Sequence, residues 1–172
     1  MVIKYYTDGA CSTNGTWQGG WSMVCVAKNH VTSVGGFESK TTNNRMELKG
    51  FLQALIDAYD AVVEEEDDEL NCTQYCFEIC TDSAYIHNCF KQKWYESWER
   101  NGWRNAKKEP VANRDLWEEI LDLVRKIGMH RLTFTKVKGH NGDKYNEMAD
   151  EIAVKCKDEQ KEYFKCFVLK GE

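Results

Sequence analysis

The sequence has little of several features that define other classes of protein. It holds a single proline among 172 residues, and no apolar run approaches the roughly 18 residues needed to cross a bilayer. The start of the chain shows no signal-peptide pattern. These absences exclude a membrane protein and predict a cytoplasmic one.

Basic residues are fewer than acidic ones, 23 against 28, and their placement is uneven. The net charge of −5 argues mildly against a nucleic-acid partner. Residues 91–110, however, hold six basic and only three acidic side chains, among three tryptophans. A local basic surface on an acidic chain remains compatible with binding nucleic acid.

Cysteine is plentiful, with eight residues. Cys72, Cys76 and Cys80 recur every four residues, but no CxxC pair or neighbouring histidine completes a zinc site. Because nothing at the N-terminus indicates an oxidising compartment, we expect reduced thiols that pack as small hydrophobes.

The first forty residues predict an antiparallel meander of three strands, 2–9, 19–28 and 31–40. The first strand is apolar on both faces, as central strands are, and we expect it to end at Asp8. Gly9 can then turn the chain with a positive φ. Residues 41–44 supply helix-capping side chains, and the apolar spacing after them predicts a helix of about five turns with Glu47 in its first turn.

The remaining chain alternates strands and helices. Six consecutive acids, Glu64–Glu69, predict a solvated loop within an insertion over 64–74. The next strand ends at Asp82, a glycine-flanked loop carries His140, and Asp150 lies in the early turns of the last predicted helix. The elements predicted between these points are a strand over 75–81, helices over 83–90 and 113–127, and a strand over 130–137.

This order of elements predicts an α/β fold with a mixed five-stranded sheet, three antiparallel strands followed by two parallel ones, and helices on both faces. Asp8 and Asp82 end strands, while Glu47 and Asp150 lie near helix starts, so the four acids can converge at one edge of the sheet. Four crowded carboxylates would repel one another unless divalent cations neutralise them. Carboxylates and water are the ligands that Mg²⁺ prefers, and two such ions about 4 Å apart suit phosphodiester cleavage.

Five runs carry a more specific signal, and a sixth tract accompanies them. The runs are Thr7-Asp8-Gly9-Ala10, Thr42-Asn43-Asn44-Arg45-Met46-Glu47-Leu48, Thr81-Asp82-Ser83, Lys138-Gly139-His140-Asn141-Gly142 and Asn146-Glu147-Met148-Ala149-Asp150. The tract runs from Trp94 through Trp98, Trp103 and Pro110 to Trp117. Together they resemble type 1 ribonuclease H in its bacterial form with a basic protrusion, or handle, and the match covers roughly residues 3–157 in family order.

The resemblance implies an endonuclease that cuts the RNA strand of RNA–DNA hybrids and leaves 3′-hydroxyl and 5′-phosphate ends. It implies that Asp8, Glu47, Asp82 and Asp150 hold two Mg²⁺ ions, with Mn²⁺ as a possible substitute, and that His140 assists proton transfer or product release. The substrate-binding residues that it implies are Cys11, Asn14, Asn43 and Asn44 in the minor groove, with Thr42, Lys91, Lys93, Trp94, Trp98, Trp103, Arg104, Lys107 and Lys108 on the DNA strand. We expect a monomer with a catalytic domain over 1–157, a handle over about 91–110 and a C-terminal extension of unknown role over 158–172.

The chain departs from the family pattern at two single positions and in a longer segment between Glu47 and Asp82, and two other functions stay open. Gly15 stands where members often have proline, and Ala84 where they often have glutamine, which removes one polar contact to the hybrid. One alternative is a related metal nuclease, such as the nuclease domain of a reverse transcriptase or a recombinase core. The other is a catalytically silent hybrid-binding protein, against which the presence of all four acids argues.

Overall fold

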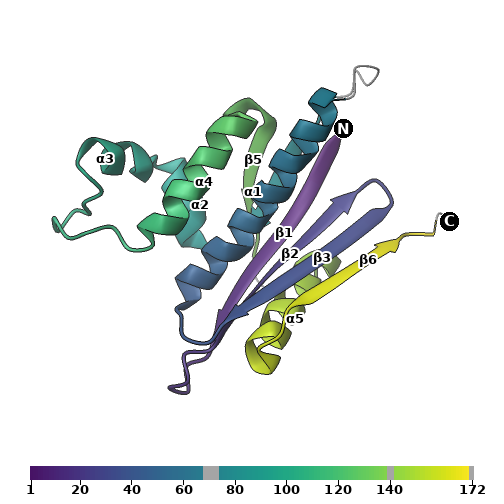
Figure 1. The fold of residues 1–172 in the computed structure, drawn as a ribbon, viewed down its shortest axis with the longest axis horizontal. Coiled ribbons are helices and arrows are strands. Elements are labelled where there is room, and N and C mark those ends of the chain that lie inside the picture. The colour runs from purple at the N-terminus through teal and green to yellow at the C-terminus, as the bar shows by residue number, and fades with distance from the viewer. Residues whose placement is uncertain (68–73, 139–141, 171–172) are drawn as a thin grey trace.

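The computed structural model describes residues 1–67, 74–138 and 142–170. In this part of the chain, one six-stranded sheet has the strand order β5-β4-β1-β2-β3-β6. Figure 1 shows helix α1 crossing one face of the sheet while α5 lies behind the other. The strands are β1 (Val2–Cys11), β2 (Gly19–Ala27), β3 (His30–Glu38), β4 (Cys76–Thr81), β5 (Leu132–Lys136) and β6 (Tyr163–Val168).

The helices connect the strands in the predicted order. They are α1 (Asn43–Asp67), α2 (Ala84–Lys91), α3 (Trp94–Arg100), α4 (Arg114–Ile127) and α5 (Lys144–Glu159), with a short 3₁₀ turn, η1 (Met129–Arg131), before β5. β1 pairs antiparallel with β2 and parallel with β4, and β5 continues the parallel side. The predicted mixed α/β fold is therefore confirmed, and no helix within the described ranges is long and apolar enough to span a membrane.

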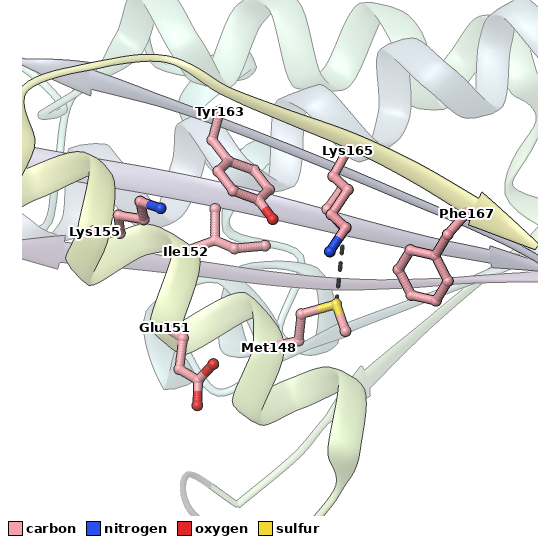
Figure 2. Close-up of a pocket in the computed structure, with 8 residues that line it drawn as sticks. Met148, Glu151, Ile152, Lys155, Tyr163, Lys165 and Phe167 are labelled. Atoms are coloured by element: carbon pink, nitrogen blue, oxygen red, sulfur yellow. Dashed lines mark hydrogen bonds between the residues drawn. The ribbon is translucent and has the colours of Figure 1, made fainter.

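The strand count differs from the prediction because the C-terminal extension supplies a sixth strand. β6 pairs antiparallel with β3, from His30↔Val168 to Gly35↔Tyr163, and covers the edge that a five-stranded sheet would leave open. Between β6 and α5 lies a pocket of about 300 Å³, into which Tyr163, Lys165 and Phe167 point from the strand (Figure 2). A strand in this extension was not predicted.

Helix α1 is also longer than predicted. It continues to Asp67, so the first four residues of the acid run are helical rather than part of a loop, and the rest of the insertion up to residue 73 lies outside the described residues. Glutamate is a good helix former, and Glu65 gains partners by staying helical. Its Oε2 accepts hydrogen bonds at 3.0 Å from Arg131 Nη1 and from the backbone N–H of Tyr75.

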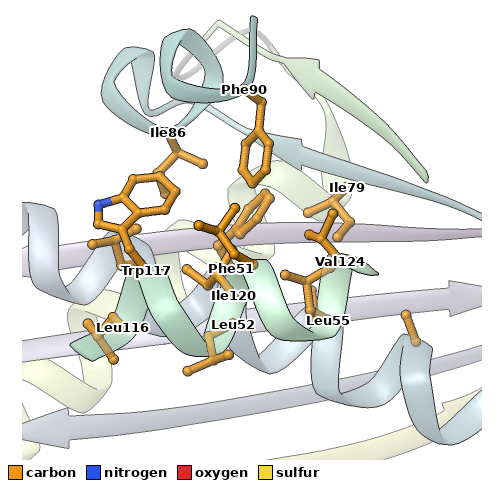
Figure 3. Packing of buried hydrophobic residues seen from close by; sticks show 14 of the residues in the cluster. Phe51, Leu52, Leu55, Ile79, Ile86, Phe90, Leu116, Trp117, Ile120 and Val124 are labelled. Atoms are coloured by element: carbon orange, nitrogen blue, oxygen red, sulfur yellow. The ribbon is translucent and has the colours of Figure 1, made fainter. Parts of the chain in front are cut away.

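Two apolar clusters hold the layers together, one on each face of the sheet. The larger lies under α1, where Trp117, Ile120 and Val124 of α4 pack against Phe51 and the other apolar residues of α1 (Figure 3). The smaller lies under α5 and includes Tyr6, Val24, Val31 and Ile152. Burial on both faces explains why β1 has so few polar residues before Thr7, and it fixes α1 and α5 on opposite sides of the same strand.

Candidate metal-binding active site

Asp8 and Asp82 meet because their strands are parallel neighbours. The β1–β4 pairing ends at Thr7↔Thr81, so each aspartate is the first residue beyond that ladder and the two lie side by side. β1 itself does not end there, which corrects the prediction: it continues to Cys11 by pairing with β2, with Asp8 opposite Ser22. The carboxyl edge of a parallel pair is where sheets of this kind place their functional groups.

Gly9 does not turn the chain, contrary to the prediction, because it lies within β1 and is not among the glycines with positive φ. Its lack of a side chain serves a different purpose. A Cβ at this position would lie 2.3 Å from the backbone nitrogen of Glu47, and one at Gly50 would lie 2.6 Å from the carbonyl oxygen of Ser22. The two glycines let α1 touch the sheet backbone to backbone, which brings Glu47 against Asp8.

The three carboxylates of Asp8, Glu47 and Asp82 form a cluster. One oxygen of each lies within 4.8 Å of the others, and Asp8 and Glu47 are buried. Asp8 Oδ1 accepts a hydrogen bond from the backbone N–H of Gly9 at 2.8 Å. Glu47 is 5% exposed, and its Oε2 has no hydrogen-bond partner within the described ranges.

Burial and mutual repulsion change the acidity of two of these groups. Desolvation, followed by the charge of Asp82 and then the influence of Asp150, raises the pKa of Asp8 from 3.8 to about 7. Desolvation, followed by the charges of Asp8 and Asp82, raises the pKa of Glu47 well above its usual value. The cluster consists of acids alone, so a divalent cation with oxygen ligands fits it.

Asp150 approaches from the opposite face of the sheet. It lies on α5, which Asp143 caps by accepting hydrogen bonds from the backbone N–H groups of Tyr145 and Asn146 at 3.0 and 3.1 Å. Ser22 Oγ donates to the carbonyl oxygen of Ala149 at 2.6 Å, which ties this turn of α5 to the strand beside Asp8. The structure thus brings the predicted fourth acid to the same edge, while His140 lies outside the described residues.

The residues predicted to line the minor groove surround this edge, together with Thr42, which was predicted to hold the DNA strand. Thr42, Asn43 and Asn44 are exposed at the start of α1, Cys11 is half-buried at the end of β1, and Asn14 is exposed in the loop after it. Arg45, which sequence reasoning did not single out, fixes the start of α1: its guanidinium forms two hydrogen bonds to Asp115, at 3.0 and 2.7 Å. The pairing with Asp115, 70 positions away, left no local signal by which to find it.

The handle separates into an outer basic surface and an inner aromatic layer. The exposed basic residues are Lys91, Lys93, Arg104, Lys107 and Lys108, which were predicted to bind the DNA strand, and Arg100. Trp98 and Trp103 are each only 9% exposed and belong to the core, whereas Trp94 is half-buried and lines a surface pocket beside Arg104. Direct contact of the two buried indoles with nucleic acid stays a prediction. Their burial favours a role in supporting the exposed lysine and arginine side chains.

Residues 2–157 match the family model described as RNase H, so the chain belongs to the ribonuclease H family and is a ribonuclease H enzyme. It is 41% identical to "Ribonuclease H" of Syntrophomonas wolfei over 151 residues, which cover 88% of this chain and 92% of the relative. It is 44% identical to "Ribonuclease H" of Caldicellulosiruptor saccharolyticus over 151 residues, with the same coverage.

Solved structures agree with this assignment. LC9-RNase H1, described as a type 1 RNase H with the type 2 active-site motif, superimposes with a TM-score of 0.70 at 25% identity, covering 97% of this chain and 77% of that one. LC11-RNase H1 in complex with an RNA/DNA hybrid shares the fold, with a TM-score of 0.58 at 21% identity, covering 92% of this chain and 98% of that one.

Proposed function

We propose that this enzyme hydrolyses the RNA strand of RNA–DNA hybrids with the help of two Mg²⁺ ions, which Mn²⁺ can replace, and leaves 3′-hydroxyl and 5′-phosphate ends. The observation that carries the proposal is the buried Glu47 Oε2, which lacks a hydrogen-bond partner within the described ranges and lies in a cluster with Asp8 and Asp82. Membership of the ribonuclease H family supports the choice of substrate, and LC11-RNase H1, which shares the fold, was solved in complex with such a hybrid.

We assign the four acids different roles as metal ligands according to where each one lies. Asp8 interacts with Glu47, Asp82 and Asp150, so we assign it the shared ligand position. Asp150 completes the set from α5. When bound, the cations would neutralise these carboxylates, polarise the scissile phosphate and lower the pKa of the attacking water. His140 is proposed to accept or deliver a proton near the leaving group.

The residues at the start of α1 and in the β1–β2 loop are proposed to read the sugar. The ribose 2′-hydroxyl both donates and accepts hydrogen bonds in a wide, shallow minor groove. Asn43 and Asn44 are exposed and carry amides able to do both. Asn14 uses its Oδ1 within its own loop, accepting from Thr16 N at 3.1 Å and Thr16 Oγ1 at 2.8 Å, so we assign its Nδ2 group the role of donor.

Cleavage of end-labelled duplexes tests the reaction. The hybrid should be cut only on its RNA strand and only with Mg²⁺ or Mn²⁺, while duplex DNA and duplex RNA should stay intact. A single 2′-deoxy substitution beside the scissile phosphate should slow cleavage there at least about tenfold, because it leaves polar side chains unpaired. Cleavage that persists in chelator, or equal cleavage of duplex RNA, would contradict the proposal.

The salt dependence of hybrid binding tests the handle. Replacing Lys107 and Lys108 with alanine should raise KM, keep kcat, and reduce the slope of log affinity against log salt by roughly 1–2. Lys161→Ala is the matched control, because Lys161 is also exposed but lies in the segment between α5 and β6. If the slope for the Lys107 and Lys108 variant is the same as for Lys161→Ala and wild type, these two handle residues do not bind the hybrid.

We further propose that the enzyme acts as a monomer in the cytoplasm. All four acids come from one chain, so the site needs no partner. The seven cysteines in the described ranges are free, which suits a reducing compartment.

A further inference from the structure

The loop between β1 and β2 is held in a defined shape by its own polar groups. The backbone N–H of Ser12 donates to the carbonyl oxygen of Gln18 at 2.8 Å, which closes the base of the loop. Inside it, Asn14 Oδ1 accepts hydrogen bonds from Ser12 Oγ at 2.5 Å and from two groups of Thr16. The loop therefore presents Trp17 from a fixed backbone.

Trp17 has an unusual backbone conformation for a residue of its size. Its φ is 58°, in the left-handed region where glycine or asparagine is preferred, and strained residues of this kind gather at functional sites. Its carbonyl oxygen accepts a hydrogen bond from the backbone N–H of Thr41 at 2.8 Å and a weaker one from Cys11 Sγ at 3.8 Å. A glycine would make the same backbone contacts without strain, so the backbone does not explain the tryptophan.

The indole does not serve the fold either. It is 53% exposed, and within the described ranges it has no ring contact and no hydrogen bond. A lone exposed aromatic is ordinary on a protein surface. A lone exposed aromatic on a strained backbone is not, because the indole gains little from burial while the conformation costs free energy.

The position of Trp17 shows what its indole can meet. Cys11 follows Asp8 by one short stretch of β1, and Thr41 closely precedes the exposed residues that begin α1. Figure 1 shows this loop beside the start of α1, at the end of the sheet where β1 terminates. Trp17 therefore lies on the rim of the candidate active site, between the two segments proposed to read the groove.

We propose that Trp17 is a substrate-binding residue whose indole packs against the sugars lining the minor groove of the hybrid. The inference rests on the proposed function and adds to it an apolar contact beside the asparagine amides. Sugar rings present C–H groups to an aromatic face, and aromatic contacts with nucleic acid contribute substantially while tolerating any sequence. The contact should therefore help affinity for the duplex rather than choice of sequence.

The test compares Trp17→Gly, Trp17→Phe and a control with wild type. Glycine removes the indole and also the backbone strain, so a purely structural residue would leave KM unchanged. We expect Trp17→Gly to raise KM for the hybrid at least about fivefold with kcat and melting temperature kept, and Trp17→Phe to stay within about twofold of wild type. Phe164→Ala is the control, because Phe164 is 73% exposed but lies on β6, and its KM should not change.

Fluorescence gives a second readout that does not depend on turnover. Addition of hybrid in chelator should change the emission of wild type more than that of Trp17→Phe, because only wild type carries the indole at the groove. A wild type that cleaves hybrid, together with a Trp17→Gly variant whose KM stays close to that of wild type, overturns this inference and leaves the proposed function standing. A wild type that does not cleave hybrid overturns the proposed function itself.

Discussion

Helix α1 carries carboxylates at both of its ends, and the surroundings of the carboxylates at the two ends are opposite in character. Near the start, Glu47 is buried, its Oε2 has no hydrogen-bond partner within the described ranges, and acids are the charged groups that most affect it. Near the end, Glu65 is paired with Arg131 and bonded to a backbone N–H, and Glu64, Glu66 and Asp67 extend beside it. The same residue type thus destabilises the fold at the end where we propose that it binds metal, and stabilises the fold at the other end.

The largest expected effect on activity comes from neutralising Asp8, which lies in the cluster of acids at the start of α1. Asp8→Asn should lower kcat/KM at least about 100-fold, because it removes a carboxylate that we propose holds the cations at the scissile phosphate. In chelator the same variant should melt about 2–4 °C higher than wild type, because it relieves repulsion of about 1 kcal/mol. Glu64→Gln, an equally conservative change at the far end, is the control and should do neither. An Asp8→Asn variant that melts below wild type in chelator would show that the cluster is not strained.

The pH dependence of stability without metal should report the same burial and repulsion of the carboxylates. The folded-state pKa of Asp8, about 7, is above its ordinary value of 3.8. The contribution of Asp8 to the free energy of unfolding is therefore fully present below pH 3.8 and is lost as pH rises through about 7. The melting temperature in chelator should therefore fall between those two pH values, and the raised pKa of Glu47 acts in the same direction. The fall should be shallower for Asp8→Asn, and a melting temperature that rises over this range in wild type would contradict the assignment.

At the other end of α1, removing the cation should cost stability and leave chemistry intact. Both side chains of the Arg131–Glu65 pair are mostly buried, so Arg131→Ala leaves Glu65 without its counter-charge. We expect a loss of about 2 kcal/mol, seen as a melting temperature about 4–8 °C lower, with kcat/KM unchanged at temperatures where the variant is folded. Arg131→Lys should recover part of the loss, and thermal melts of the three proteins check this.

The smallest effect should follow from neutralising the other acids of the same end. Glu64 lies about 25 Å along the helix from Glu47, about three Debye lengths at 0.15 M salt. Replacing Glu64, Glu66 and Asp67 with glutamine should therefore change kcat/KM for the hybrid less than about threefold. A gain well beyond that range would show that this end repels the substrate and lies nearer to it than the helix geometry indicates.

Local patterns in the sequence predicted most elements and the meeting of the acids, because strand alternation and capping residues act over a few positions. Asp82 lies where the strand pattern ends, and Ser83 caps the next helix by accepting a hydrogen bond from Ile86 N at 3.3 Å. Family motifs supplied what local patterns could not, namely the roles proposed for the four acids.

The predictions failed where a distant partner decides the structure. The extent of α1 depends on Arg131, which follows Glu65 by 66 positions, and an acid run alone indicates a loop. The strand at β6 has the alternating, aromatic-rich pattern of Tyr163–Val168, but its partner is an edge that only the assembled sheet provides. Gly9 suggests a turn and hence a strand end at Asp8, whereas the glycine is needed for the contact with α1.

That contact has a consequence for anyone who redesigns this enzyme. The strand that bears Asp8 and the helix that bears Glu47 meet main chain against main chain at Gly9 and Gly50, so neither position has room for a side chain. The addition of a single methyl group, as in Gly9→Ala, would place a carbon against the backbone of Glu47 and move the carboxylates of Asp8 and Glu47 apart.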